Sequence, residues 1–227
     1  MTFSEIFNII FVENQNLILT GFKNTLLIAF FGFLMGIALG IVVAFIKILP
    51  RNNVVTKLLN AVASLYTSFF RGTPIIAQLL LFYYGLLIYT GIDPVVVCII
   101  IFGLNSGAYM SEIMRAGIQS IDKGQMEAGR SLGLNGMSTM FRIVLPQAIK
   151  NMIPTMTNEF IALVKETSVI GYISVLDITR VIQQISAKTY DLFLTYLILA
   201  LIYYIIVLIL STLLKLIERR LRKSESR

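Results

Sequence analysis

A carboxylate lies inside an apolar stretch of this sequence, where a charge is costly. Glu159 is about the middle of the segment 152–164, and Thr155 and Asn158 add polar atoms on adjoining parts of the predicted helix. Ionisable residues inside membrane spans usually face a cavity or a partner group. We therefore predict that Glu159 binds the ammonium or guanidinium group of an amino acid through charge-assisted hydrogen bonds. The alternative is a structural ion pair with one of three cations: Lys165, Arg71 or Arg115.

The run Arg-Gly-Thr-Pro at 71–74 interrupts another apolar segment. Gly permits unusual backbone dihedrals, and Pro74 removes a backbone donor, so the helix should break here. Transporters often bind substrates at interrupted helices. Arg71 and Thr73 are therefore candidate substrate ligands, with Arg71 holding a carboxylate. The alternative interpretation is that Arg71 lies at a helix end and its side chain snorkels to the membrane surface.

Two further sets of polar residues lie on predicted helices. Asn105, Tyr109 and Glu112 share one helical face, which makes Asn105 and Tyr109 candidates for lining a cavity. Glu112 and Arg115 are three residues apart and are expected to pair near the cytoplasmic end of their helix. Four polar residues at the outer end of the segment containing Glu159 form either an external gate or an interfacial anchor: Lys165, Glu166, Thr167 and Ser168.

A short helix is predicted between Asp122 and Gly133. Asp122 followed by Gln125 is typical of a capping box, and Gly133 is a natural left-handed stop. A helix of two to three turns is marginal alone in water, so it must pack on something. Apolar contacts are expected from Met126, Ala128 and Leu132, and Pro146 is expected to stop or kink the helix that follows. Such a two-faced helix is either a peg for a partner's groove or an ordinary interfacial loop.

Composition sets the environment of these residues. Of the 227 residues, 57% are hydrophobic and only 14% are charged, whereas a soluble domain has about 25% charged residues. The chain therefore belongs in lipid. It has no His and one Cys, Cys98, which excludes a disulfide framework, a His-ligated metal and a His-based triad. The net charge of +7 is attributed to cytoplasmic loops rather than to nucleic acid binding.

The sequence predicts a single all-α transmembrane domain over residues 1–227, with five spans. Residues 3–12 are expected to form an interfacial helix instead. The spans are placed at about 20–48, 62–91, 94–117, 148–168 and 190–216, with a cytoplasmic loop at about 120–146. Lys and Arg concentrate in the first and third connections and in the tail, whereas the second carries only Asp93. The positive-inside rule then puts the N-terminus outside and the C-terminus in the cytoplasm.

Glycines recur at helical spacing in two of these spans. Gly32, Gly36 and Gly40 repeat every four residues, and so do Gly103 and Gly107. Small residues at this spacing let helix backbones approach closely in lipid. Packing within the chain is favoured over a dimer face.

The stretch EAGRSLGLNGMSTMFRIVLPQAI at 127–149 resembles the EAA loop of permease subunits of ATP-binding-cassette (ABC) importers. Gly129 replaces the second Ala of that motif, a small-for-small change. Three further runs are similar to the polar amino acid branch of the family: FRGTPIIAQL at 70–79, AYMSEIMRAGIQSIDKGQ at 108–125 and LVKETSVIGYI at 163–173. The residues that match the motif exactly are Glu127, Ala128, Gly133, Ile143, Leu145 and Pro146.

This resemblance implies a type I ABC importer permease of the bacterial cytoplasmic (inner) membrane. Its partners would be a second permease subunit, expected to be an identical copy although a paralogue stays open, two cytoplasmic ATPase subunits and an extracellular or periplasmic amino acid binding protein. The chain has no GxxxxGK[ST] motif and no cofactor of its own, so ATP and Mg²⁺ would bind the ATPase. ATPase coupling would involve Gln125, Glu127, Ala128, Gly129, Arg130, Leu132, Gly133 and Pro146.

The expected function is import of basic or polar amino acids such as arginine, lysine, histidine or glutamine, without enzymatic activity in this chain. The alternative is a self-contained channel or secondary amino acid transporter, which would leave the 120–146 loop unexplained. A membrane-embedded enzyme is harder to assemble without His, although carboxylate chemistry at Glu112 and Glu159 is formally open.

Overall fold

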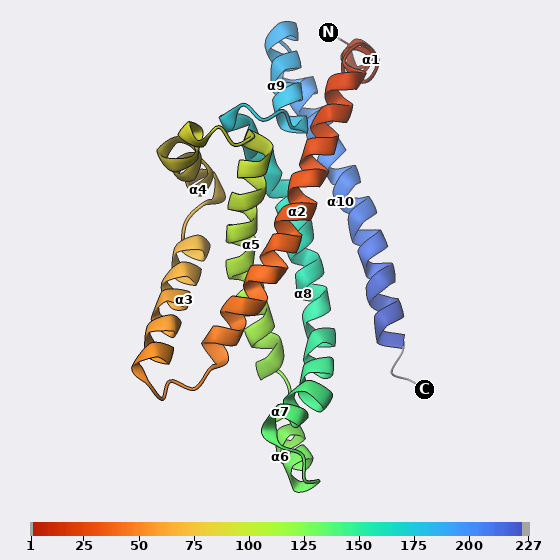
Figure 1. Ribbon diagram of the computed structural model, residues 1–227. Coiled ribbons are helices and arrows are strands. Elements are labelled where there is room, and N and C mark those ends of the chain that lie inside the picture. Colours follow the sequence, from red (N-terminus) through yellow and green to blue (C-terminus); the bar gives the residue numbers. More distant parts are fainter. Residues whose placement is uncertain (1, 224–227) are drawn as a thin grey trace.

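A computed structural model describes residues 2–223, without the side chains of Arg219 and residues 221–223; the predicted cytoplasmic Arg227 lies outside the described residues. The described part consists of helices joined by short connections and contains no strand (Figure 1). Its α-helices are α1 (Phe3–Asn8), α2 (Gln15–Ile48), α3 (Val54–Gly72), α4 (Ile75–Phe82), α5 (Pro94–Gln119), α6 (Lys123–Ser131), α7 (Gly136–Thr139), α8 (Leu145–Glu166), α9 (Ile178–Thr189) and α10 (Leu192–Lys223). Shorter π or 3₁₀ turns are η1 (Ile9–Glu13), η2 (Tyr83–Leu87), η3 (Ile88–Thr90), η4 (Met140–Val144) and η5 (Thr167–Ile173).

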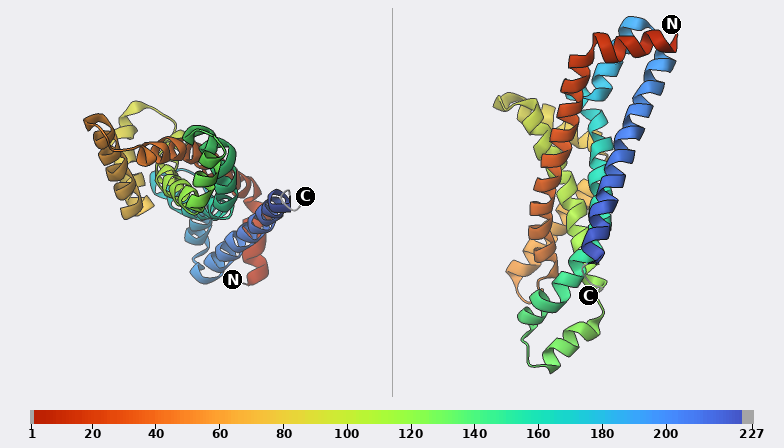
Figure 2. Two further views of the ribbon diagram at one scale, coloured as in Figure 1. Left: turned by 90° about the horizontal axis from the view of Figure 1, so that it is seen from below. Right: turned by 90° about the vertical axis from the view of Figure 1, so that its right-hand side faces the viewer.

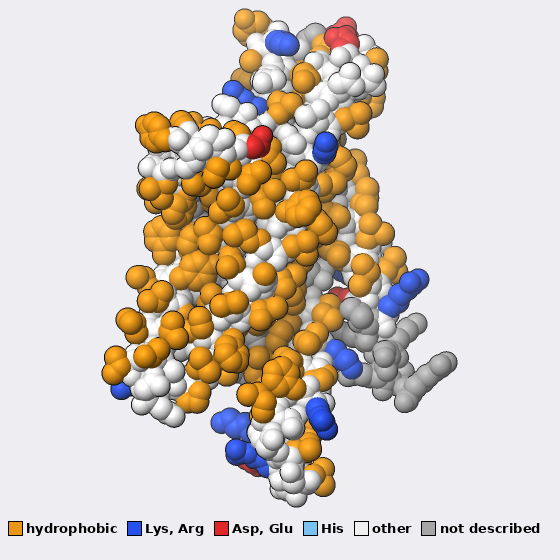
Figure 3. Space-filling model, viewed as in Figure 1, with side chains coloured by type: hydrophobic (Ala, Val, Ile, Leu, Met, Phe, Trp, Pro, Cys, Tyr) orange, Lys and Arg blue, Asp and Glu red, His pale blue; other side chains and the backbone are white. Residues whose placement is uncertain are grey.

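Three helices of the described chain are long and apolar enough to cross a membrane: α2, α5 and α10. The pair α3 and α4 passes the same test together but is bent by 111°. Hydrophobic side chains cover most of the face seen in Figure 3, and Lys and Arg side chains lie mainly toward its two ends. α8 runs alongside α2, α5 and α10 but carries Lys150, Glu159 and Lys165. The chain is thus a bundle of mainly apolar helices, whose number of spans stays a prediction.

The two ends of the bundle differ. α1 lies across one end rather than continuing straight into α2, and α9 lies at the same end (Figure 2). There the backbone of Asp177, the N-cap of α9, packs against Gly21 of α2. α6 and α7 project from the opposite end (Figure 1). The connection between α5 and α8 is therefore separated from both the chain's first helix and α9.

The predicted break at 71–74 is confirmed, because α3 ends at Gly72 and α4 begins at Ile75. The amide of Gln78 satisfies the carbonyls that the break leaves free: its Nε2 donates to Phe70 O at 2.8 Å and to Thr73 O at 3.0 Å. Asn105 Nδ2 donates to Phe70 O at 3.1 Å and to Gln78 Oε1 at 2.9 Å. Unpaired polar groups away from water are costly, so this network stabilises the bend.

The glycine repeats form the contact between α2 and α5. A methyl group at Gly36 would lie 2.7 Å from Ser106 Cβ, and one at Gly40 would lie 2.5 Å from Met110 Cβ. From the other side, Gly103 faces Met35 and Gly107 faces Leu39. The predicted packing within the chain is confirmed at this seam, which we call the glycine seam.

We expect Gly36→Ala to lower the unfolding temperature by several degrees, because overpacking a tight contact costs about 1–3 kcal/mol. Gly85→Ala is the control, since nothing lies within 4 Å of a methyl group there. The chain has no Trp, so unfolding in detergent is best followed by circular dichroism. Equal unfolding temperatures for the two variants would contradict the seam's role.

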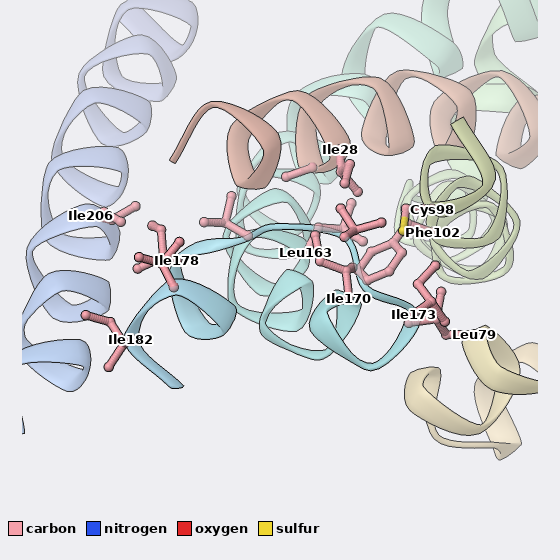
Figure 4. Close-up of a cluster of buried hydrophobic side chains, with 14 of the residues drawn as sticks. Ile28, Leu79, Cys98, Phe102, Leu163, Ile170, Ile173, Ile178, Ile182 and Ile206 are labelled. Carbon is pink, nitrogen blue, oxygen red and sulfur yellow. The ribbon is translucent and has the colours of Figure 1, made fainter. Parts of the chain in front are cut away.

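A cluster of buried hydrophobic side chains holds the helices together and includes residues of α1 and α9 (Figure 4). Ile28 of α2, Phe102 of α5 and Leu163 of α8 meet there with Ile170 of η5. Cys98 is buried in the same cluster, as expected for a small packing residue. The cluster fixes α5 and α8 side by side, and these two helices carry most of the predicted site.

Candidate functional site

The predicted short helix between α5 and α8 is present as α6. Its N-cap is Asp122, whose Oδ1 accepts a hydrogen bond from Gly124 N at 2.7 Å. The expected capping box is wrong, because the side-chain Oε1 of Gln125 instead accepts from Gln147 Nε2 of α8 at 3.3 Å. Gly133 has a φ of +86°, the left-handed conformation predicted for the stop.

The apolar contacts of α6 differ from the prediction. Leu132 is 82% exposed and Ala128 is also exposed, so neither packs the helix onto the chain. The buried residue of α6 is Gly129, where an added methyl group would overlap Thr139 and lie 3.2 Å from Ile143 Cδ1. The motif's departure at Gly129 thus lets α6 lie directly on the segment that follows it. As a result Leu132 points away from the chain.

The two charged residues of α6 are accessible. Glu127 and Arg130 are exposed and line a cavity of about 660 Å³ between α6, the end of α5 and η4, together with Met126. Pro146 was expected to stop or kink a helix, but it lies in the first turn of α8. Pro is tolerated there because first-turn N–H groups have no partner within the helix. α6 is therefore a short projecting helix backed by the start of α8.

A polar cavity of about 520 Å³ lies between the end of α3, the C-terminal half of α5 and the N-terminal half of α8. It brings together three of the predicted ligands: Arg71, Tyr109 and Thr155. The Arg71 guanidinium carbon lies 5.5 Å from the centre of the Tyr109 ring, a cation–π contact. The cavity also contains Glu112, so it presents a guanidinium, a phenol and a carboxylate to the same space.

Glu112 joins three elements of the bundle. Its carboxylate lies 2.6 Å from Lys47 Nζ of α2, 2.7 Å from Arg115 Nη2 and 3.9 Å from Arg71 Nη1 of α3. The predicted pair of Glu112 and Arg115 is confirmed, but the contact with Lys47 is the more buried one, with side chains 11% and 18% exposed. Three cations of the described chain surround this one carboxylate, and Arg71 is the one that lines the cavity with it.

Asn105 and Thr73 do not line this cavity. Asn105 is buried, and its amide nitrogen is used by the network at the helix break. Thr73 Oγ1 donates to Phe69 O and accepts from Gln78 Nε2, both at 2.8 Å. The structure thus gives both residues a role in the bend, which positions Arg71 at the cavity edge.

Glu159 and Asn158 follow Thr155 by about one turn of α8. Asn158 is exposed and Glu159 is half-buried. Among the described residues, Glu159 makes no ion pair with Lys165, Arg71 or Arg115, which were the partners expected from the structural alternative. A carboxylate left without a cation inside a bundle of apolar helices is suited to bind one from outside the chain.

The four predicted gate residues lie where α8 passes into η5. Thr167 is buried and its hydroxyl donates to Val164 O at 2.7 Å, so it caps the end of α8. Ser168 lines a small cavity of about 230 Å³ that also contains Arg180 of α9. Lys165 is exposed and Glu166 is half-buried.

Sequence reasoning missed several cavity residues. Asn151 and Ser120 line the cavity, and Asn151 Nδ2 donates to Ser120 Oγ at 3.0 Å. Asn151 precedes Thr155 and Glu159 by four and eight residues, so helical spacing alone placed it on their face. The ion pair of Lys47 with Glu112 was also missed. No local sequence pattern predicts it, because it depends on how α2 packs on α5.

Residues 36–223 match the family model described as "Binding-protein-dependent transport system inner membrane component". The chain is 40% identical over 210 residues to the arginine transport system permease protein ArtQ of Bacillus subtilis, covering 92% of this chain and 94% of that protein. It is 39% identical over 206 residues to a putative glutamine transport system permease protein GlnP of Rickettsia typhi, covering 90% and 92%. The L-cystine transport system permease protein TcyB of Bacillus subtilis is 42% identical over 80% of this chain and 78% of that protein.

Solved structures agree with these relatives. A chain in the crystal structure of an amino acid ABC transporter with histidines superposes with a TM-score of 0.83 and 39% identity, covering 92% of this chain and 96% of that one. The methionine ABC transporter MetNI in an inward-facing conformation matches with a TM-score of 0.77 at 19% identity, covering 92% of this chain and 98% of that one, which shows a shared fold.

Proposed function

This chain belongs to the family of binding-protein-dependent transport system inner membrane components, and we propose that it forms half of a dimeric pathway for basic or polar amino acids. It is a permease subunit of an amino acid ABC importer and a multi-pass protein of the inner membrane. It is not itself an enzyme, since the ATPase of such an importer resides in partner subunits. A substrate-binding protein completes the set of partners.

The proposed topology has five spans over residues 1–227, with the N-terminus outside and the C-terminus in the cytoplasm. α2, the bent α3–α4 pair, α5, α8 and α10 provide the spans, and residues 120–146 face the cytoplasm. The charge distribution supports this orientation, because Lys and Arg gather in the α2–α3 connection and between α5 and α8. Five helices are few for enclosing an amino acid, which supports a pair of subunits.

The proposed substrate site combines the polar cavity with the neighbouring turn of α8. Arg71 would hold the carboxylate of the amino acid, and Tyr109 would hold Arg71 in place. Glu159 would bind the ammonium or guanidinium group, with Thr155 and Asn158 beside it. A cavity of about 520 Å³ is in the range of small-molecule sites. Arginine, glutamine and L-cystine appear in the names of the relatives, which supports a polar amino acid as the substrate of this chain.

The proposed coupling element is α6 with its flanking residues. The observation that supports it is a capped, projecting helix whose outward Leu132 is 82% exposed, with Glu127 and Arg130 beside it. An ATPase groove that receives this helix would convert ATPase closure into movement of α5 and α8, which are joined to it at either end. A self-contained transporter has no use for such a projection. Lys165–Ser168 remain a proposed external gate.

The experiment that tests the proposed function is arginine uptake into proteoliposomes containing the permease, its ATPase and its binding protein. With the ATPase subunits facing the vesicle interior, uptake is expected to require ATP and Mg²⁺ inside the vesicles. Uptake is also expected to stop when the binding protein is omitted. Equal uptake by the permease alone would favour the self-contained transporter.

A further inference from the structure

A second polar cavity, with no assigned role, lies at the turn between α2 and α3. Its volume is about 360 Å³, and it is lined by Arg51, Lys57, Asn60, Ala61 and Ser64. Two of these residues are cations and none is acidic. Lys57, Ala61 and Ser64 follow one another at helical spacing, so they line a single face of α3. Ala61 leaves room on that face that a larger side chain would fill.

Arg51 is held in position rather than free in solvent. Its Nη2 donates to Asn60 Oδ1 at 2.6 Å, and Asn60 Nδ2 donates in turn to Ile46 O at 3.1 Å. Asn60 is only 3% exposed, so this arrangement is anchored in the contact between the two helices. The other N–H donors of the guanidinium remain available, because Arg carries five in a fixed fork.

The two cations of this cavity lack a counter-ion. Among the described residues, neither Arg51 nor Lys57 makes an ion pair. Lys47, the cation that precedes them in the chain, by contrast donates to Glu112 and Thr67. The cavity therefore presents two positive charges that no carboxylate of the described residues neutralises, and the guanidinium of Arg51 is held in place. Such a pair of cations can bind a phosphate monoanion or a phosphodiester.

The surroundings of the cavity are apolar. Val54 is 80% exposed, and Val55 and Leu58 are each 64% exposed, on the first turns of α3. In the proposed topology, on which this inference rests, the turn between α2 and α3 lies at a lipid–water interface, so these side chains meet acyl chains while the two cations stay at headgroup level. We propose that this cavity binds the phosphate of an anionic glycerophospholipid, with the acyl chains lying along α3. A zwitterionic headgroup would bring its ammonium group against Arg51 and Lys57 and is disfavoured.

The test is native mass spectrometry of the assembled transporter, purified in detergent and titrated with phosphatidylglycerol or phosphatidylethanolamine. Arg51→Gln combined with Lys57→Gln is expected to remove one tightly bound phosphatidylglycerol per permease subunit and to weaken its binding about ten- to thirtyfold. Ala61→Leu, which keeps both charges but fills the cavity, is expected to have the same effect. Lys23→Gln combined with Lys188→Gln, which removes two cations elsewhere, is expected to retain the lipid.

Lipid retention by both cavity variants equal to that of the unmodified transporter would overturn the proposal. So would displacement of the lipid by millimolar inorganic phosphate, because the cavity would then be a free-anion site. The unfolding temperature in lipid-free detergent is expected to stay unchanged for Ala61→Leu, which leaves the hydrogen bond between Arg51 and Asn60 in place. Retention of the lipid by Ala61→Leu alone would show that charge acts without the cavity and would also overturn the proposal.

Discussion

Replacing Glu159 with Gln is expected to lower ATP-driven arginine uptake by the assembled importer about ten- to a hundredfold. The variant keeps the shape of the side chain and removes its charge, and a hydrogen bond to a charged group contributes about 1.5–3 kcal/mol. Glu159 has no cation from the chain to neutralise it among the described residues, so substrate is the group that loses a partner. Uptake is measured in proteoliposomes at equal amounts of inserted protein.

Two controls separate binding from folding. Glu159→Asp keeps the charge and should recover part of the uptake, whereas Glu5→Gln removes a carboxylate from the exposed first turn of α1 and should change nothing.

Comparison of arginine uptake with glutamine uptake identifies the substrate group that Glu159 binds. A loss confined to arginine indicates the guanidinium, and an equal loss for both indicates the α-ammonium. Arginine uptake that stays normal in Glu159→Gln, with normal expression, contradicts the proposed site.

Leu132→Asp is expected to abolish uptake by uncoupling the permease from its ATPase. Leu132, the C-cap residue of α6, is 82% exposed, so its substitution should leave the fold intact. A central apolar anchor of an interface is worth about 2 kcal/mol or more, and a carboxylate in its place adds a desolvation penalty. The association of ATPase subunits, measured by co-purification, should therefore weaken at least about thirtyfold.

The matched control for Leu132→Asp is Tyr190→Asn. Tyr190 is 91% exposed at the end of α9, far along the bundle from α6 (Figure 1), and its φ of +55° is one that Asn tolerates. This control should keep both ATPase binding and uptake. If Leu132→Asp retains a full complement of ATPase subunits and normal uptake, α6 is not the coupling element and the loop needs another explanation.

Local sequence signals predicted the local features well. The helix stop at Gly133, the break before Pro74 and the pair of Glu112 with Arg115 all depend on residues a few positions apart. The glycine repeats predicted a close helix contact because their spacing is itself the signal. For the same reason the outline of α6 emerged from the residues between Asp122 and Gly133.

The features that were missed depend on which helices become neighbours. Lys47 reaches Glu112 across 65 residues of sequence, and Asn105 reaches Phe70 across 35. Neither contact has a periodic pattern, and so Asn105 was assigned to the cavity although it supports the bend. The outward direction of Leu132 follows from the packing of Gly129 on Thr139. This contact also depends on the fold, because the turn after α6 brings the two residues together.

The glycine seam has a mechanical consequence. Where backbones touch through glycine there is no layer of flexible side chains to slide or repack, so we expect α2 and α5 to behave as one stiff beam. Only three residues separate the end of α5 at Gln119 from the start of α6 at Lys123, and a push on α6 therefore reaches this beam over a very short span of chain. The bend between α3 and α4 is tied to this beam, because Asn105 Nδ2 of α5 donates to Phe70 O and to Gln78 Oε1. A push on α6 would then move α2, α5 and the bend beside Arg71 together as one unit.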